Sequence, residues 1–162
     1  MRLSLFISAT LLIASASLAN ARPLLETHFH SATSTGCFVR TYSAAHLAKH
    51  PDQLVRYISL SPVPNVAPAG QTLLNLTVNL RGSDYFPSSF VYCRPKGDAL
   101  SCAMEGDAGR FTLSGREKGQ VLLTVGRDGL VFEGQNEFVT ISGTSGDDRT
   151  FLIATVSLDL CS

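Results

Sequence analysis

The sequence describes a small chain with no excess of either charge. It has 162 residues, 13 Lys and Arg against 13 Asp and Glu, and 44% of its residues are hydrophobic. This length is enough for one domain with a substantial core. Balanced charge without a run of Lys or Arg gives no electrostatic basis for binding nucleic acid or an anionic membrane. We therefore expect one folded domain and no nucleic-acid partner.

The first residues follow the pattern of a secretory signal peptide. Arg2 supplies a positive charge, residues 3–14 are apolar, and residues 19–21 form a small-x-small cleavage site before Arg22. We predict that residues 1–21 are a signal peptide and that the protein is exported, either to a periplasm or out of the cell. No later stretch is apolar enough to cross a bilayer, so we expect no integral membrane segment.

The four cysteines predict two disulfide bonds, since an even number in an exported chain is typical of oxidised pairs. Gly97-Asp98 suits a two-residue hairpin loop, and counting outward places Cys93 opposite Cys102 at a non-hydrogen-bonded pair. The Cα atoms of such a pair lie about 4.5 Å apart, near the short limit for a disulfide. Cys37 would then pair with Cys161. A four-residue loop would break this register and leave the pairing open.

The beginning of the exported chain predicts a flexible arm followed by one β domain. Residues 22–36 show no hydrophobic period, and the domain is expected to cover residues 37–162. Ser43 is a suitable N-cap for one or two helical turns, which Pro51 would end. This is the only helix that we expect.

Most of the remaining sequence has the period of two that is typical of half-buried strands. The clearest strand covers residues 72–80, where Leu74, Leu76, Val78 and Leu80 alternate with polar residues. Further strands are expected near residues 38–42, 54–60, 90–96, 99–104, 110–113, 121–125, 130–133, 138–142 and 150–160. With no crossover helices, the fold class is all-β: an antiparallel meander closed as a small barrel or folded as a sandwich.

Three details of the strand pattern make specific predictions. Leu54, Ile58 and Leu60 are expected to share one face of their strand. Asp128-Gly129 suits a second two-residue turn, which would place Val125 opposite Phe132. In the last strand, the even-numbered residues form one apolar side: Leu152, Ala154, Val156, Leu158 and Leu160.

One stretch resembles a family. Residues 42–53 follow the motif Tyr-x-Ala-Ala-His-Leu-x-x-His-Pro-x-Gln, which, with Cys93 and Cys102, is similar to a group of small exported bacterial proteins without an assigned function. The resemblance implies a further cysteine shortly after Cys102, where this chain has Glu105. It implies no activity and no functional residue.

The histidines raise the possibility of a metal site. His46 and His50 stand one helical turn apart, the separation at which two imidazoles can share Zn²⁺ or Cu²⁺, with His28, His30 or Asp52 as a further ligand. The alternative is structural: His46 packs, and His50 lies at a helix C-terminus, where the helix dipole favours its protonated form. The HExxH arrangement of a catalytic zinc site is absent from the sequence.

Catalytic signatures are weaker still. There is no Gly-x-Ser-x-Gly elbow, and two disulfides leave no free thiol as a nucleophile. Glu105 with Asp107, and Glu133 with Glu137, are pairs of carboxylates of the kind glycosidases use, but in loops such pairs are usually solvated. We therefore expect no enzyme and no cofactor.

The remaining class is a non-catalytic binding or inhibitor-type module. Its partner would be a protein, contacted by the arm or by residues 62–70, or a small apolar ligand held in a barrel mouth. The aromatic residues that would line such a mouth also suit a hydrophobic core: Phe86, Phe90, Tyr92, Phe111 and Phe132. Metal binding by His46 and His50 is the alternative function.

Overall fold

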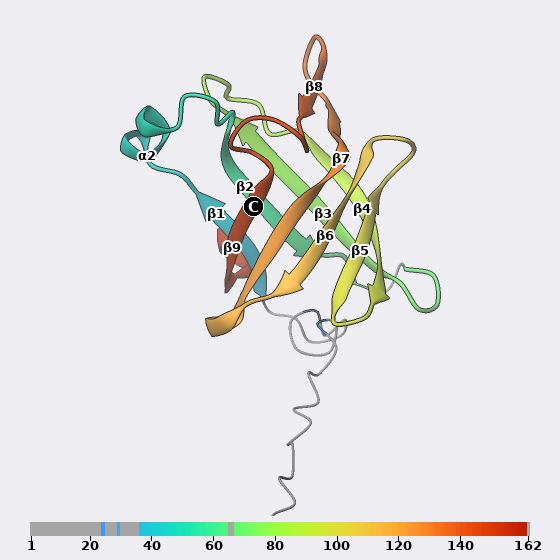
Figure 1. Ribbon diagram of the computed structural model, residues 1–162. Coiled ribbons are helices and arrows are strands. Elements are labelled where there is room, and N and C mark those ends of the chain that lie inside the picture. Colours follow the sequence, from blue (N-terminus) through green and yellow to red (C-terminus); the bar gives the residue numbers. More distant parts are fainter. Residues whose placement is uncertain (1–23, 25–28, 30–35, 65–66, 162) are drawn as a thin grey trace, which may run out of the picture.

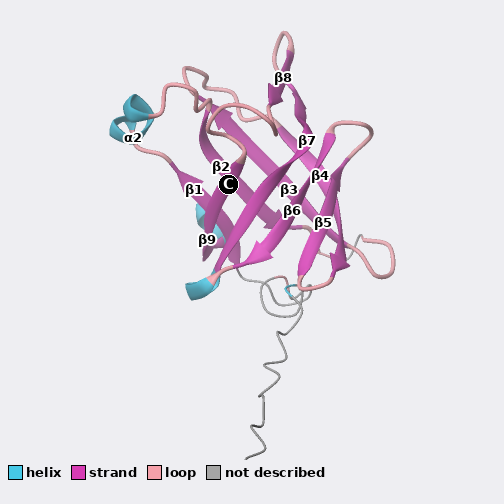
Figure 2. Ribbon diagram, viewed as in Figure 1, coloured by secondary structure: helices cyan, strands magenta, loops and turns pink. Residues whose placement is uncertain are grey.

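The computed structural model describes residue 24, residue 29, residues 36–64 and residues 67–161. These residues form an antiparallel barrel of eight strands, which confirms the all-β prediction and selects the barrel over the sandwich. Helical segments are short and lie at the edges of the barrel (Figure 2). The predicted signal peptide and most of the predicted arm lie outside the described residues.

The barrel strands follow one another as a meander until the last one. Their bounds are β1 Gly36–Thr41, β2 Val55–Pro62, β3 Thr72–Leu80, β4 Ser88–Lys96, β5 Ala99–Met104, β6 Gly109–Gly115, β7 Gln120–Glu133 and β9 Thr150–Ser157. A ninth strand, β8 Phe138–Ile141, pairs with the end of β7 as a hairpin that rises from the rim (Figure 1). The short helices are α2 Ala44–Lys49, η1 Glu117–Gly119 and η2 Leu158–Leu160.

Strand β9 closes the barrel. It pairs with β1 on one side, with Cys37 opposite Val156, and with the first half of β7 on the other, with Val121 opposite Ile153. Because β1 is also paired with β2, the closed wall has no free edge along most of its height.

The interior of the barrel is filled with side chains. Eight strands enclose a space that side chains alone can fill. Five phenylalanines are at most 2% exposed: Phe29, Phe38, Phe111, Phe132 and Phe151. Leu24 and Phe29, which lie in the predicted arm, belong to this core, and the ring centroids of Phe29 and Phe38 are 4.9 Å apart. The arm therefore contributes two side chains to the core.

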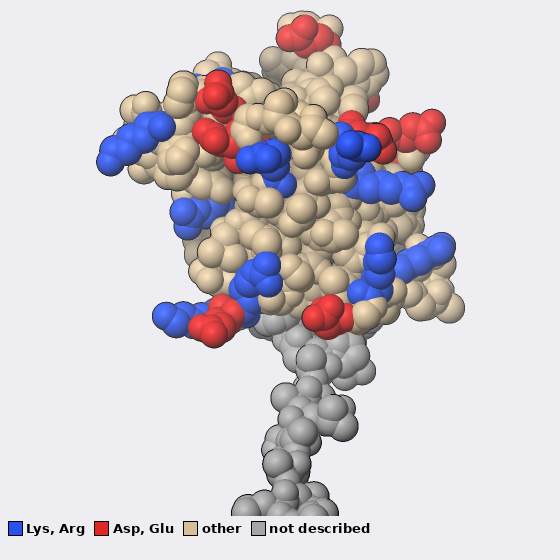
Figure 3. All heavy atoms as spheres, in the orientation of Figure 1, with Lys and Arg blue, Asp and Glu red and all other residues tan. Residues whose placement is uncertain are grey.

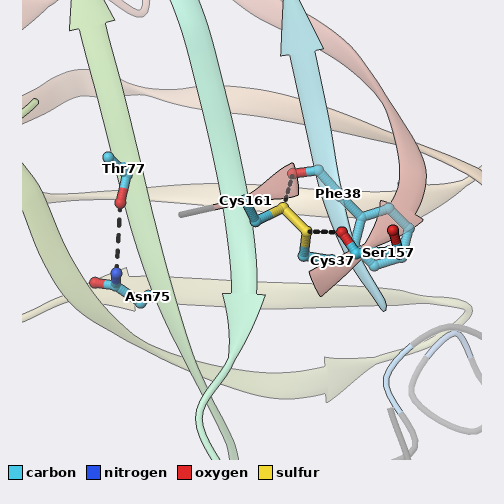
Figure 4. The surroundings of a disulfide bond; sticks show 6 residues. All are labelled: Cys37, Phe38, Asn75, Thr77, Ser157 and Cys161. Carbon is cyan, nitrogen blue, oxygen red and sulfur yellow. Dashed lines mark hydrogen bonds between the residues drawn. A yellow bond between two sulfur atoms is a disulfide. The ribbon is translucent and has the colours of Figure 1, made fainter. Parts of the chain in front are cut away.

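Both predicted disulfides are present. The predicted register of the hairpin between β4 and β5 is confirmed, with Lys96 opposite Ala99 and Cys93 opposite Cys102, whose Cα atoms are 4.1 Å apart. The second bridge joins Cys37 in β1 to Cys161 after η2, with Cα atoms 6.3 Å apart. Its sulfur atoms lie next to the carbonyl oxygens of Ser157 and Phe38 (Figure 4).

The prediction of a two-residue turn at Asp128-Gly129 is wrong. Strand β7 runs through these residues, Val125 lies opposite Phe111, and Phe132 lies opposite Val139. Between Val125 and Leu130 the strand bulges relative to β6, and Gly129 within this bulge has φ +80°. A Cβ atom on Gly129 would lie 2.7 Å from the Ile141 carbonyl oxygen, so the position has no room for a side chain. Positive φ at an Asp-Gly pair serves a bulge here instead of a hairpin loop.

One predicted face is wrong, and a second lies on the outside of the barrel. Leu54 is 48% exposed, whereas Ile58 and Leu60 are fully buried, because a bulge between Val55 and Tyr57 shifts the alternation by one residue. In β9 the inward residues are Phe151 and Ile153, so the even-numbered side faces outward, and Leu152 is 40% exposed.

The outer surface carries charges of both signs side by side, with no large area of one sign on the face shown in Figure 3. Within the described part of the chain, no helix has the length and hydrophobicity needed to cross a membrane.

Candidate functional site

The residues of the 42–53 motif form a corner between helix α2 and the barrel. Ser43 begins the helix as predicted: its hydroxyl accepts a hydrogen bond from the His46 N–H at 3.2 Å. Leu47 is the buried residue of the helix. At the other end, the Arg81 guanidinium donates to the carbonyl oxygens of Leu47 and His50, each at 2.8 Å. The same two carbonyl oxygens also accept from the N–H groups of His50 and Gln53, so Arg81 adds a second hydrogen bond to each at the end of the helix.

Rings of this corner stack in a row. The Tyr42 and His46 centroids are 4.8 Å apart, and the His46 and His50 rings are stacked at 4.3 Å with an interplanar angle of 17°. At one end the Arg40 guanidinium lies over the Tyr42 ring. At the other, Nδ1 of His50 lies 3.3 Å from a carboxylate oxygen of Asp147. Burial raises the pKa of Tyr42, against the opposing effect of Arg40.

Gln53, the last residue of the motif, holds the His46 ring in place with its side chain. Its side chain is only 3% exposed. The amide nitrogen donates to the Val55 carbonyl at 2.9 Å, which leaves the amide oxygen to accept a hydrogen bond from Nε2 of His46 at 2.9 Å. This arrangement places the His46 proton on Nε2. The motif therefore encodes the packing of the corner.

A buried carboxylate ties the loop after β8 to this corner. Asp148 is 3% exposed, and its oxygens accept hydrogen bonds from the N–H groups of Leu54 at 2.6 Å and Val55 at 3.2 Å. Burial raises the pKa of Asp148, although these two hydrogen bonds and the charge of Arg81 act in the opposite direction. The neighbouring Asp147 raises it further.

In this arrangement the two histidines do not point toward a common ion. The lone pairs of stacked imidazoles lie in nearly parallel planes, and a shared metal requires them to converge. Among the described residues, no three His, Cys, Asp or Glu side chains are grouped so that they could hold a metal ion. His28 and His30 lie outside the described residues. Metal binding by His46 and His50 stays a prediction.

A second feature of the surface is an open hollow of about 650 Å³ at the rim, on the side of the β7–β8 hairpin. It lies between the start of β4 and the end of β7, above the loop of residues 105–108. Two exposed aromatic side chains flank it, Phe90 at 46% and Phe138 at 74%. Its charged residues are Glu105, Asp107 and Glu133, and no Lys, Arg or His contributes to its described lining.

The predicted site residues are divided between core and surface. Phe111 and Phe132 are core residues, Tyr92 is half-buried, and Phe86 and Phe90 are exposed. The two predicted carboxylate pairs meet in part, since Glu105, Asp107 and Glu133 line one hollow and Glu137 lies outside it. The approach of Glu133 to Glu105 and Asp107 was not predictable from the sequence, because it lies at the end of β7 and they lie in the loop between β5 and β6.

Several residues of these two sites were missed at the sequence level. Asp148, Arg81 and Phe138 stand in polar or turn-like surroundings that give no signal of their partners. Gln53 had a signal, its place in the motif with His46 and His50, but its contact with His46 depends on the bend after Pro51.

No protein-family model, no curated protein and no solved structure matches this chain.

Proposed function

We propose that this chain is an exported, disulfide-stabilised binding module without catalytic activity, which acts by contacting a partner protein, for example to inhibit it. Export is supported by the signal-peptide pattern of residues 1–21 and by the two disulfides.

The observation that carries this proposal is the contrast between a filled interior and an open rim. Core residues such as Leu74, Leu113 and Leu123 are fully buried inside the barrel, so an internal ligand would have to displace them. The rim instead presents the hollow with the exposed Phe90 and Phe138. Exposed aromatic residues beside a hollow are typical of a surface that contacts a protein.

The test is to identify a partner and rebuild the complex from purified components. The oxidised chain is immobilised and exposed to the exported proteins of the cells that produce it, with the reduced, unfolded chain as control. A protein retained only by the folded chain is then purified and titrated against it by isothermal calorimetry.

A saturable complex of defined stoichiometry would support the proposal. The proposal fails if no protein distinguishes the folded from the unfolded chain, or if the captured protein does not bind once purified. A ligand-dependent rise in melting temperature with a small apolar probe such as 1-anilinonaphthalene-8-sulfonate would favour a ligand pocket over a protein partner.

A further inference from the structure

The hollow at the rim lies where two strands continue past their neighbours. The last pair between β4 and β5 is Val91 with Met104, and beyond it Glu105 donates one hydrogen bond to the Phe90 carbonyl at 3.1 Å. Residues 88–89 of β4 extend further. On the other side, the last pair between β6 and β7 is Gly109 with Leu130. Residues 132–133 of β7 extend beyond it.

The strand pairing shows where the backbone groups of these extensions point. Val78 donates to the Pro87 carbonyl, so Pro87 faces β3 and the next residue, Ser88, directs its N–H and C=O away from β3. Gly134 donates to the Glu137 carbonyl, so Glu133 directs its backbone groups away from β8 by the same alternation. Both sets of groups face the side of the hollow. A strand edge that continues past its partner is a template for a further strand.

The side chains of the hollow define the chemistry of an occupant. Phe90 and Phe138 offer aromatic faces to an apolar or cationic side chain. Glu105, Asp107 and Glu133 are exposed carboxylates, and the described lining holds no cation to neutralise them. The complementary partner is positively charged.

We propose that the hollow binds an extended, basic segment of the partner protein. The segment adds as a short strand along the β4 edge at Ser88, its Lys or Arg side chains pair with Glu105, Asp107 and Glu133, and Phe90 and Phe138 enclose its alternate side chains. This inference rests on the proposed function and names the chemistry of the partner.

The probe is a short fluorescein-labelled peptide of alternating Lys and Val, with the matching peptide of alternating Glu and Val as control. Fluorescence anisotropy at low ionic strength measures binding to the full oxidised chain. We expect the Lys peptide to bind, the Glu peptide not to bind, and binding to weaken as salt is added. Amide chemical shifts should change at residues 88–90 and 131–133. A Lys peptide methylated on every backbone nitrogen should lose binding, because neither of its edges can then donate a hydrogen bond to β4.

Matched variants separate the hollow from the general charge of the protein. The double variant Glu105→Lys, Glu133→Lys should bind the Lys peptide about tenfold or more weakly than the wild type. The control variant Asp98→Lys, Glu117→Lys reverses two exposed carboxylates elsewhere and should bind the peptide as tightly as the wild type. Phe138→Ser should weaken binding, and Phe86→Ser, which removes an exposed phenyl group outside the hollow, should not. Circular dichroism checks that each variant is folded.

The inference is overturned if the Lys peptide does not bind, if both charge-reversed variants bind it equally, or if the shifted amides lie elsewhere. If the methylated peptide still binds, the segment does not bind by adding as a strand to β4. Binding of the purified partner protein shows whether only the inference about the hollow fails or the proposed function fails with it. If the partner binds the Glu105→Lys, Glu133→Lys variant as tightly as the wild type, the hollow is not its binding site. The proposal that the chain is a binding module would still stand.

Discussion

The carboxylate of Asp148 accepts a 2.6 Å hydrogen bond from the N–H of Leu54, 94 residues earlier in the chain. The same carboxylate accepts a bond from the N–H of Val55, the first residue of β2. Asp148 therefore joins the loop between β8 and β9 to the segment that follows helix α2. It holds together the corner in which Tyr42, His46 and His50 stack.

Replacing Asp148 should destabilise the fold far more than replacing its neighbour. In Asp148→Ala the N–H groups of Leu54 and Val55 lose their acceptor, and we expect a loss of about 2 to 4 kcal/mol in the free energy of unfolding. Asp147→Ala removes an exposed carboxylate whose one described contact is His50, and should cost less than about 1 kcal/mol. Urea denaturation measures both. Equal losses would show that Asp148 does not hold the corner.

The raised pKa of Asp148 predicts a pH dependence of stability. The folded chain keeps the proton of this carboxyl group to a higher pH than the unfolded chain, whose value is about 3.9. The free energy of unfolding therefore falls as pH rises from the unfolded to the folded pKa. Relative to Asp148→Asn, the wild type should lose stability through this window and then remain level. If the wild type instead gains stability relative to Asp148→Asn as pH rises, the hydrogen bonds from Leu54 and Val55 outweigh the effect of burial.

The two disulfides should differ in their contribution to stability. Cys37 and Cys161 are 124 residues apart, whereas Cys93 and Cys102 are 9 apart. In the chain-entropy model, replacing the long-range pair by Ala costs about 5 kcal/mol and replacing the hairpin pair about 2.5 kcal/mol. Thermal unfolding of the two double variants measures the difference. Equal losses would indicate that the packing of Cys93 and Cys102 in the core offsets the difference in loop length.

Zinc should not stabilise the folded chain through its histidine pair. Nε2 of His46 is bonded to Gln53, and its ring is stacked on that of His50, so both rings would have to turn before they could share an ion. We expect excess Zn²⁺ to leave the melting temperature of the wild type unchanged relative to His46→Ala with His50→Ala. A rise confined to the wild type would establish the metal-binding alternative.

A close backbone approach near the β7 bulge should not tolerate a side chain. A Cβ atom on Gly143 would lie 1.7 Å from the Gly126 carbonyl oxygen, so Gly143→Ala must separate two backbones. We expect a loss of about 3 kcal/mol or more. In the control Gly97→Ala the space is open and only the positive φ is unfavourable, which costs about 1 kcal/mol. Chemical denaturation compares the two, and similar losses would mean that the backbones separate without cost.

The sequence by itself determined the features that depend on neighbours along the chain. The alternation of residues 72–80 identified β3 to the residue, and Gly97-Asp98 set the register that brings Cys93 to Cys102. Ser43 capped the predicted helix. These features follow from local backbone preferences and from counting outward from a turn, so no distant contact is needed to specify them.

Only the tertiary structure decided the features that depend on distant segments. Closure through β9, the bulge at Gly129, the bond from Leu54 to Asp148 and the meeting of Glu105 with Glu133 all join parts of the chain that are remote in sequence. An Asp-Gly pair permits a turn or a bulge, and the partner strand selects between them. Period two likewise defines the two faces of a strand, but closure of the barrel decides which face is buried.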